Sequence, residues 1–193
     1  GHKLHGPKGV GALYVRRGTR FRPLLRGGHQ ERGRRAGTEN SASIVGLGMA
    51  CELAELHMPM LQGPIRELRD RLQEGLLARI PCARVTGDPQ NRTANTLNIA
   101  FEYVEGEAIL LMLNQLGIAA SSGSACTSGS LDPSHVLLAI GVPVEVAHGS
   151  LRLSLSGENT PAQVAHIAET VPRVVAYLRS ISPVWEQMQN EKA

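Results

Sequence analysis

The cysteine at position 126 lies where a thiol has no packing role. Residues 121–130 read SSGSACTSGS, so its neighbours are serine, glycine, threonine and alanine. Buried cysteines usually lie among large aliphatic side chains and behave as small hydrophobic residues. An exposed thiol is open to oxidation, and its thiolate is the nucleophilic form. The composition of the stretch therefore indicates a reactive Cys126 on a polar loop.

Two basic residues are further candidates. Lys3 follows His2 and precedes a Gly-Pro-Lys-Gly turn, and a lysine amine forms covalent bonds to carbonyl carbon only in its neutral form. Arg152 alternates with leucine in SLRLSL, residues 150–155. Its planar guanidinium can hold a carboxylate with two hydrogen bonds. An arginine that simply faces solvent from a half-exposed strand is the alternative.

A third candidate site binds anions. The sequence Arg34-Arg35-Ala36-Gly37-Thr38 precedes a predicted helix and combines cations, a hydroxyl and backbone N–H groups, the donors that a phosphate prefers. The alternative is that Thr38 only begins the helix. Residues 16–35 hold eight arginines against the single acid Glu31. Such a segment favours a phosphorylated ligand or an acidic partner, or is a solvated basic face.

Composition excludes several classes of protein. The chain has 193 residues, 42% of them hydrophobic, which suits one domain or one and a half with a sizeable core. The sequence contains no apolar run of 18 residues, so no membrane span is predicted. Aromatic residues make up 3% of the chain, few for a surface that stacks nucleic-acid bases. We therefore expect neither a membrane nor a nucleic-acid partner.

The cysteines indicate a reducing, cytoplasmic compartment. They number three, at positions 51, 82 and 126, with no close C-x-x-C pair, so neither a disulfide framework nor a zinc site is expected. Cys51 falls in a helical apolar pattern and is predicted to be core. Cys82 follows Pro81 and is predicted to be a turn residue.

Hydrophobic periodicity predicts an α/β fold. In the first 60 residues we expect a strand over 9–15, a loop over 16–35 and a helix from Asn40. Pro59, Gly63 and Pro64 mark a domain boundary, which divides the chain into 1–60 and 61–193. From about residue 61 the pattern predicts a smaller α+β domain.

The smaller domain is predicted in more detail. Its first helix carries an apolar stripe from Leu61 to Leu76, and alternation predicts strands over 83–87, 95–101 and 150–155. The sequence also predicts helices over 105–116 and 133–140, a brief strand over 118–120, and a helix from Pro161 with a capping box at Thr160 and Gln163. The last ten residues are polar and are expected to fray.

Several segments together resemble one family. GHKLHGPKGVGALYV (1–15), GGHQERGRRAGTEN (27–40), SSGSACTSGS (121–130), LDPSHVLLAIG (131–141) and HGSLRLSLS (148–156) are similar, in order, to the cysteine desulfurases of the nitrogen-fixation type. These belong to the class V aminotransferases, fold-type I enzymes that use pyridoxal 5'-phosphate. The resemblance implies the C-terminal part of that fold: the end of the large cofactor-binding domain, then the small C-terminal domain with the cysteine loop.

The resemblance also implies roles for particular residues. Lys3 would hold the cofactor as a Schiff base and move the substrate's Cα proton, and His2 would contact its phosphate. Thr38 would reach the phosphate of the other subunit's cofactor, which implies a homodimer with shared active sites. Arg152 would bind the carboxylate of L-cysteine. Cys126 would attack the substrate sulfur, leaving L-alanine and a persulfide.

The expected partner is an iron–sulfur scaffold protein that accepts the sulfur, and the resemblance implies nitrogenase maturation as the use of that sulfur. Cofactor contacts that the family takes from before the lysine cannot be assigned, so we expect the chain to be the C-terminal half of a longer enzyme and inactive alone. A selenocysteine lyase or another class V enzyme is an alternative, since these need Lys3 and Arg152 without a loop cysteine. A non-enzymatic basic module centred on residues 16–35 is a remote one.

Overall fold

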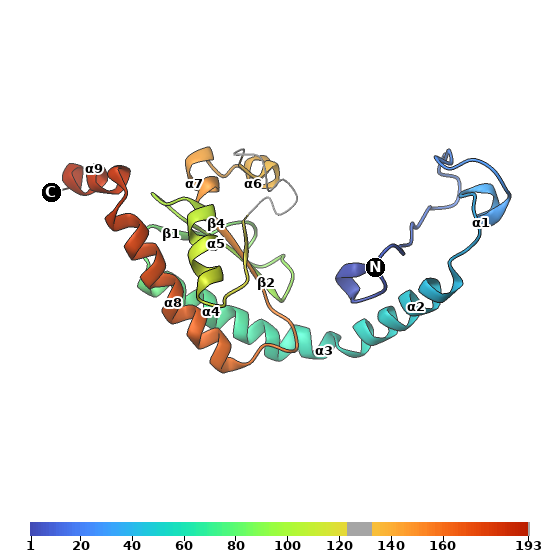
Figure 1. Cartoon of the computed structure of the whole chain (residues 1–193), viewed down its shortest axis with the longest axis horizontal. Helices are drawn as coiled ribbons and strands as arrows, with labels where there is room; N and C mark the ends of the chain where they lie inside the picture. Colours follow the sequence, from blue (N-terminus) through green and yellow to red (C-terminus); the bar gives the residue numbers. More distant parts are fainter. Residues whose placement is uncertain (123–132, 193) are drawn as a thin grey trace. The chain divides into compact units, whose positions relative to one another are not determined.

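The chain divides into two compact units, which are described separately. A computed structural model describes residues 1–122 and 133–192 (Figure 1). Unit 1 comprises Gly1–Pro59, and unit 2 comprises Met60–Ala193. Helices and strands both occur, so the predicted α/β class is confirmed.

Unit 1 is built around one long helix. The elements are the 3-10 turn η1 (His2–Leu4), α1 (Gln30–Gly33), α2 (Ser41–Leu56) and the start of α3 (Met58–Met60). The predicted helix from Asn40 is confirmed, because the Asn40 side chain caps it: Oδ1 accepts the Ser43 N–H at 3.3 Å.

Two predictions for unit 1 were wrong. Residues 9–15 form no strand, and Leu13 and Tyr14 are 74% and 86% exposed. A strand needs a hydrogen-bonded neighbour, and the described part of unit 1 has none. Cys51 is exposed, because α2 buries only Ala50 within the described structure.

Unit 2 contains an antiparallel sheet of four strands. These are β1 (Ala83–Val85), β2 (Thr96–Phe101), β3 (Ser121–Ser122) and β4 (Ser150–Ser154), in the spatial order β1-β2-β4-β3. The predicted strands over 83–87, 95–101 and 150–155 are therefore confirmed. The brief strand expected over 118–120 is wrong in position, because the pairing with β4 falls at Ser121 and Ser122.

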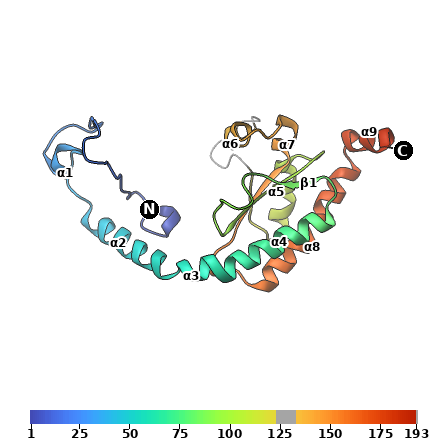
Figure 2. The ribbon, with the colours of Figure 1, turned by 180° about the vertical axis from the view of Figure 1, so that it is seen from behind.

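Three helices cover one face of this sheet. They are α4 (Arg66–Arg79), α5 (Gly106–Gln115) and α8 (Pro161–Ser180), and α4 runs beside α8 in both views (Figures 1 and 2). The core residues that they share with the sheet are Ile65, Leu68, Leu72, Leu76, Leu97, Ile99, Phe101, Ile109, Leu113, Leu151, Leu153, Val164, Val171, Val174 and Val175. The predicted stripe on α4 and the alternation in β2 are confirmed.

Local signals placed the helix ends well. The Thr160 hydroxyl accepts the Gln163 N–H while the Gln163 side chain accepts the Thr160 N–H, which is the predicted capping box. The predicted helix over 133–140 is α6 (His135–Ala139), and a further short helix, α7 (Val144–His148), was not predicted. A π-helical turn, η2 (Leu61–Ile65), leads into α4.

The C-terminal segment was predicted to fray but forms α9 (Pro183–Lys192). Trp185 anchors it: the Arg179 guanidinium lies 4.3 Å from the centre of the indole, and the Tyr103 ring centre is 5.5 Å away. Met188 is also buried. A polar sequence therefore stays helical because two side chains dock it on unit 2.

Arg179 also ties together two turns of unit 2. It is only 4% exposed, and it donates to Glu102 O at 3.2 and 2.9 Å and to Pro81 O at 2.7 Å. Burial lowers the pKa of Arg179, but an arginine remains charged at neutral pH. Its three donated bonds satisfy the backbone carbonyls of Pro81, just before β1, and of Glu102, just after β2.

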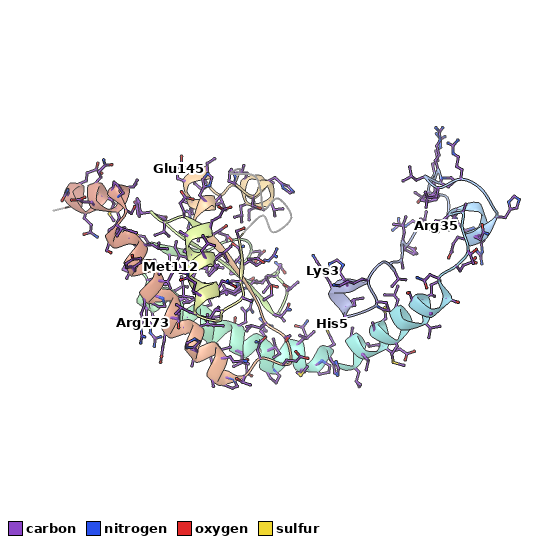
Figure 3. All side chains as sticks on the ribbon, viewed as in Figure 1. Lys3, His5, Arg35, Met112, Glu145 and Arg173 are labelled. Carbon is purple, nitrogen blue, oxygen red and sulfur yellow. The ribbon has the colours of Figure 1, made fainter. Side chains whose placement is uncertain are left out.

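Replacing Arg179 should destabilise the protein. Arg179→Met removes all three bonds and the contact with Trp185, so we expect the free energy of unfolding to fall by about 2–4 kcal/mol. Urea denaturation followed by circular dichroism measures this. Arg173→Met is the matched control, because Arg173 lies on the same helix with its side chain exposed (Figure 3). Equal stability of the two variants would contradict the role of Arg179.

Candidate functional site

Arg152 lies at the centre of the sheet of unit 2. In the register of β4, it is opposite Asn98 of β2 on one side and Ser121 of β3 on the other. Its neighbours Leu151 and Leu153 are buried in the core. Since successive side chains of a strand point to opposite faces, Arg152 faces away from the helices, together with Asn98 and Ser121.

This polar face offers hydrogen-bond donors. Arg152 is half-buried and has no hydrogen bond or ion pair to the described residues. Beside it, Asn98 Oδ1 accepts the Thr86 hydroxyl at 2.5 Å, so the oxygen of this amide is occupied. A guanidinium that no residue of the described chain engages, on a strand paired on both sides, is suited to a carboxylate, which accepts two parallel N–H bonds.

Cys126 lies outside the described residues, which resume at 133. The last described residue before it is Ser122, the final residue of β3, which pairs with Leu151. Cys126 therefore follows, by four residues of sequence, the strand that pairs with Arg152. Its role as nucleophile remains a prediction.

His2 and Lys3 lie in unit 1, in the turn η1, and both are exposed; Figure 3 shows Lys3. Backbone bonds close this turn: the N–H groups of Leu4 and Gly6 donate to Gly1 O at 3.0 and 3.1 Å. The turn therefore holds its shape while the amine of Lys3 is accessible. The roles of both residues remain predictions.

Thr38 precedes α2 and is exposed. Asn40, rather than Thr38, caps the helix, so the interpretation that Thr38 only begins α2 is wrong. The hydroxyl is therefore not used by the helix, and the guanidiniums of Arg34 and Arg35 are exposed in the same segment. This set of donors is of the kind that a phosphate group prefers, and binding of a phosphate by Thr38 remains a prediction.

The described residues offer no further candidate site in a pocket or a metal-ligand cluster. A pocket of about 800 Å³ in unit 2 is lined by α5, α7 and the α8–α9 connection, and Glu145 borders it (Figure 3). None of the predicted site residues lines it. Residues 1–122 and 133–192 contain no group of three or more His, Cys, Asp or Glu that could hold a metal ion.

Among the described helices, none alone is both long and apolar enough to cross a bilayer. One bent pair, Ser41–Leu56 with Met58–Arg79, meets the requirement by length and composition only.

Sequence reasoning missed the residues beside the candidates. Asn98 and Ser121 flank Arg152, and Gln30 contacts the backbone just before Thr38. Asn98 could have been found, because it occupies a polar position of the alternating strand β2. The pairing of Gln30 with Gly37 has no periodic signal in the sequence.

Comparison with known proteins identifies the family. The family model of the class V aminotransferases matches residues 1–167. Cysteine desulfurase NifS of Azotobacter vinelandii is 64% identical over 185 residues, which are 96% of this chain and 46% of that protein. A cysteine desulfurase of Gluconacetobacter diazotrophicus is 63% identical over 186 residues, with the same coverage of 96% and 46%.

Solved structures agree with the sequence matches. A NifS-like protein superposes with a TM-score of 0.79 at 34% identity, over 92% of this chain and 45% of that one. SspA in complex with cysteine gives a TM-score of 0.57 at 34% identity, over 80% and 42% of the two chains.

The chain belongs to the class V aminotransferase family. The predicted resemblance to cysteine desulfurases of the nitrogen-fixation type is confirmed, and so is the assignment to part of the fold-type I architecture. The chain spans about half the length of the curated relatives it matches.

Arg152 makes no hydrogen bond or ion pair within residues 1–122 and 133–192, which leads to a stability prediction. Arg152→Met removes no bond to the described residues, so the free energy of unfolding should change by less than about 0.5 kcal/mol. Leu151→Ala, one residue away but facing the core with 0% exposure, should cost about 2–5 kcal/mol. Urea denaturation of both variants measures the difference. A large loss in Arg152→Met would mean that the arginine is structural.

Proposed function

We propose that the protein is a cysteine desulfurase, which converts L-cysteine to L-alanine and retains the sulfur as a persulfide on Cys126. One observation of the structure carries this proposal: the register that pairs Ser121 with Arg152. It joins Arg152, a group suited to binding a carboxylate, to the strand that leads directly to Cys126. Cys126 is four residues along the chain from Ser122, and four extended residues span at most about 14 Å.

Support also comes from the relatives. Those that share 58–64% identity with nearly the whole chain carry the name cysteine desulfurase. One solved relative is described in complex with cysteine. An amino-acid substrate with a thiol and a carboxylate fits a site that offers a thiol nucleophile and an arginine.

The cofactor in this proposal is pyridoxal 5'-phosphate, as membership of the class V family implies. When bound, it supplies the electron sink that makes reactions at the substrate's Cα and Cβ possible. Lys3 would hold it covalently through Nζ, and His2 would contact its phosphate. Thr38 would donate its hydroxyl to the phosphate bound in the other subunit.

Each residue has a defined task in the reaction. Arg152 holds the substrate carboxylate and thereby orients the Cβ–Sγ bond, while Lys3 moves the Cα proton. The Cys126 thiolate attacks Sγ of the substrate; the S–S bond forms as the Cβ–Sγ bond breaks. Cβ retains the electron pair and takes up a proton, so the products are L-alanine and the Cys126 persulfide.

The persulfide needs an acceptor. We propose that an iron–sulfur scaffold protein receives the sulfur in the cytoplasm. We also propose that the sulfur serves nitrogenase maturation, which the name NifS of one relative supports. A homodimer follows from the proposed role of Thr38. The Ser/Gly composition around Cys126 suits transfer, because a flexible tether can serve both a closed site and an external acceptor.

Cys126 can be tested directly. In the longest reading frame that contains this chain, Cys126→Ser should abolish sulfide release from L-cysteine, because a serine hydroxyl cannot form a persulfide. Mass spectrometry of the unchanged protein after L-cysteine should show one added sulfur on the peptide with Cys126. Cys82→Ser, a half-buried turn residue, is the control and should retain full activity. Parental activity in Cys126→Ser would instead favour a class V enzyme that needs no loop cysteine.

Arg152 makes a separate kinetic prediction. Arg152→Lys keeps the charge but loses the bidentate hydrogen bonding to the substrate carboxylate, so KM for L-cysteine should rise about 10- to 100-fold. Steady-state alanine formation measures this. Arg84→Lys is matched to it, because Arg84 pairs with Ala100 and lies on the same face of the sheet. Equal KM values in the two variants would rule out carboxylate binding by Arg152.

A further inference from the structure

The loop before Thr38 is closed at its base by a side chain. The segment from Leu25 to Gly37 returns to its starting point, where Ala36 N–H donates to Leu25 O at 3.3 Å. Next to this bond, Gly37 N–H donates to Gln30 Oε1 at 3.2 Å. Gln30, near the middle of this loop, therefore contacts the residue that directly precedes Thr38.

Gly28 makes room for this contact. A Cβ added to Gly28 would lie 2.5 Å from Gln30 Oε1 and 3.1 Å from its Cδ. The backbone of Gly28 is outside the left-handed region, so a Cβ there would cause no backbone strain but would have to displace the Gln30 amide. We call Gly28, Gln30 and Gly37 the amide clamp.

The clamp restrains a point where the backbone is otherwise free. Gly37 has φ +107°, a conformation open mainly to glycine, and Thr38 makes no hydrogen bond to the described residues. On the other side, Asn40 is fixed by capping α2. Thr38 is thus held between two anchors, and Gln30 supplies the first.

We propose that Gln30 is a positioning residue, which orients the Thr38 hydroxyl toward the cofactor phosphate by holding the Gly37 amide. This inference rests on the proposed function. Gln30 itself contacts neither phosphate nor substrate. The bond from the Gly37 N–H to the Gln30 side chain restricts the backbone before the cofactor binds. Less conformational entropy is therefore lost when Thr38 becomes ordered on binding.

The test is the affinity for pyridoxal 5'-phosphate, in the longest reading frame that contains this chain. Gln30→Ala should raise the dissociation constant of the cofactor about fivefold, the equivalent of one net hydrogen bond. Gln30→Glu keeps an acceptor oxygen at the same reach and should stay within about twofold of the parent. Absorbance titration of the apoprotein gives the constants. An unchanged constant in Gln30→Ala, or an equal loss in Gln30→Glu, would overturn the proposal.

Gly28 provides a second route to the same effect. Gly28→Ala should displace the Gln30 amide and weaken cofactor binding as Gln30→Ala does. The double variant should be no weaker than Gln30→Ala alone, because the clamp can be lost only once. Gly63→Ala is the matched control, since a Cβ there meets nothing within 4 Å. Additive losses in the double variant would show that Gly28 acts independently of Gln30, against the proposal.

Hydrogen exchange separates the clamp from the proposed function. In the apoprotein, Gln30→Ala and Gly28→Ala should speed exchange of the Gly37 amide at least threefold, with the melting temperature unchanged. Unchanged exchange would overturn the clamp, whatever the cofactor does. Failure of the parent protein to bind pyridoxal 5'-phosphate, with exchange altered as expected, would instead refute the proposed function and leave the clamp as loop closure only.

Discussion

The pairing of β4 between β2 and β3 is the constraint on which the described part of unit 2 depends. It places Leu151 and Leu153 against Ile99 and Leu97 in one apolar layer. The same register places Arg152 on the other face. A shift of one residue would exchange the two faces and bury the guanidinium in the core, so the leucines that stabilise the sheet also determine where the arginine points.

The helices depend on this layer in turn. α4, α5 and α8 supply aliphatic side chains to a single cluster with the sheet, and burial of that cluster is the main favourable contribution to folding. Polar groups at the edge of this cluster are paired by specific hydrogen bonds. Arg179 does this for the carbonyls of Pro81 and Glu102, and its contact with Trp185 then holds α9 in place.

Unit 1 is organised differently, through local bonds more than through burial. Its helix α2 buries only Ala50 among the described contacts, while the Asn40 cap, the η1 turn and the amide clamp are all contacts between residues close in sequence. Local patterns predicted the helix because capping is encoded within a few residues. They were wrong for residues 9–15 and Cys51, because strand formation and burial depend on neighbours distant in sequence.

Sequence alone determined the periodic elements, the capping box of α8, the family resemblance and the list of candidate residues. Alternation even predicted that Arg152 lies opposite to the leucines of its own strand, since this follows from the backbone of a single strand. Only the tertiary structure decided that Asn98 and Ser121 flank Arg152, that α9 is held by Trp185, and that Gln30 reaches Gly37. The first two depend on contacts between residues far apart in sequence, and the third depends on the closure of a loop. None of these contacts leaves a periodic pattern in the sequence, because each depends on how the folded backbone is arranged.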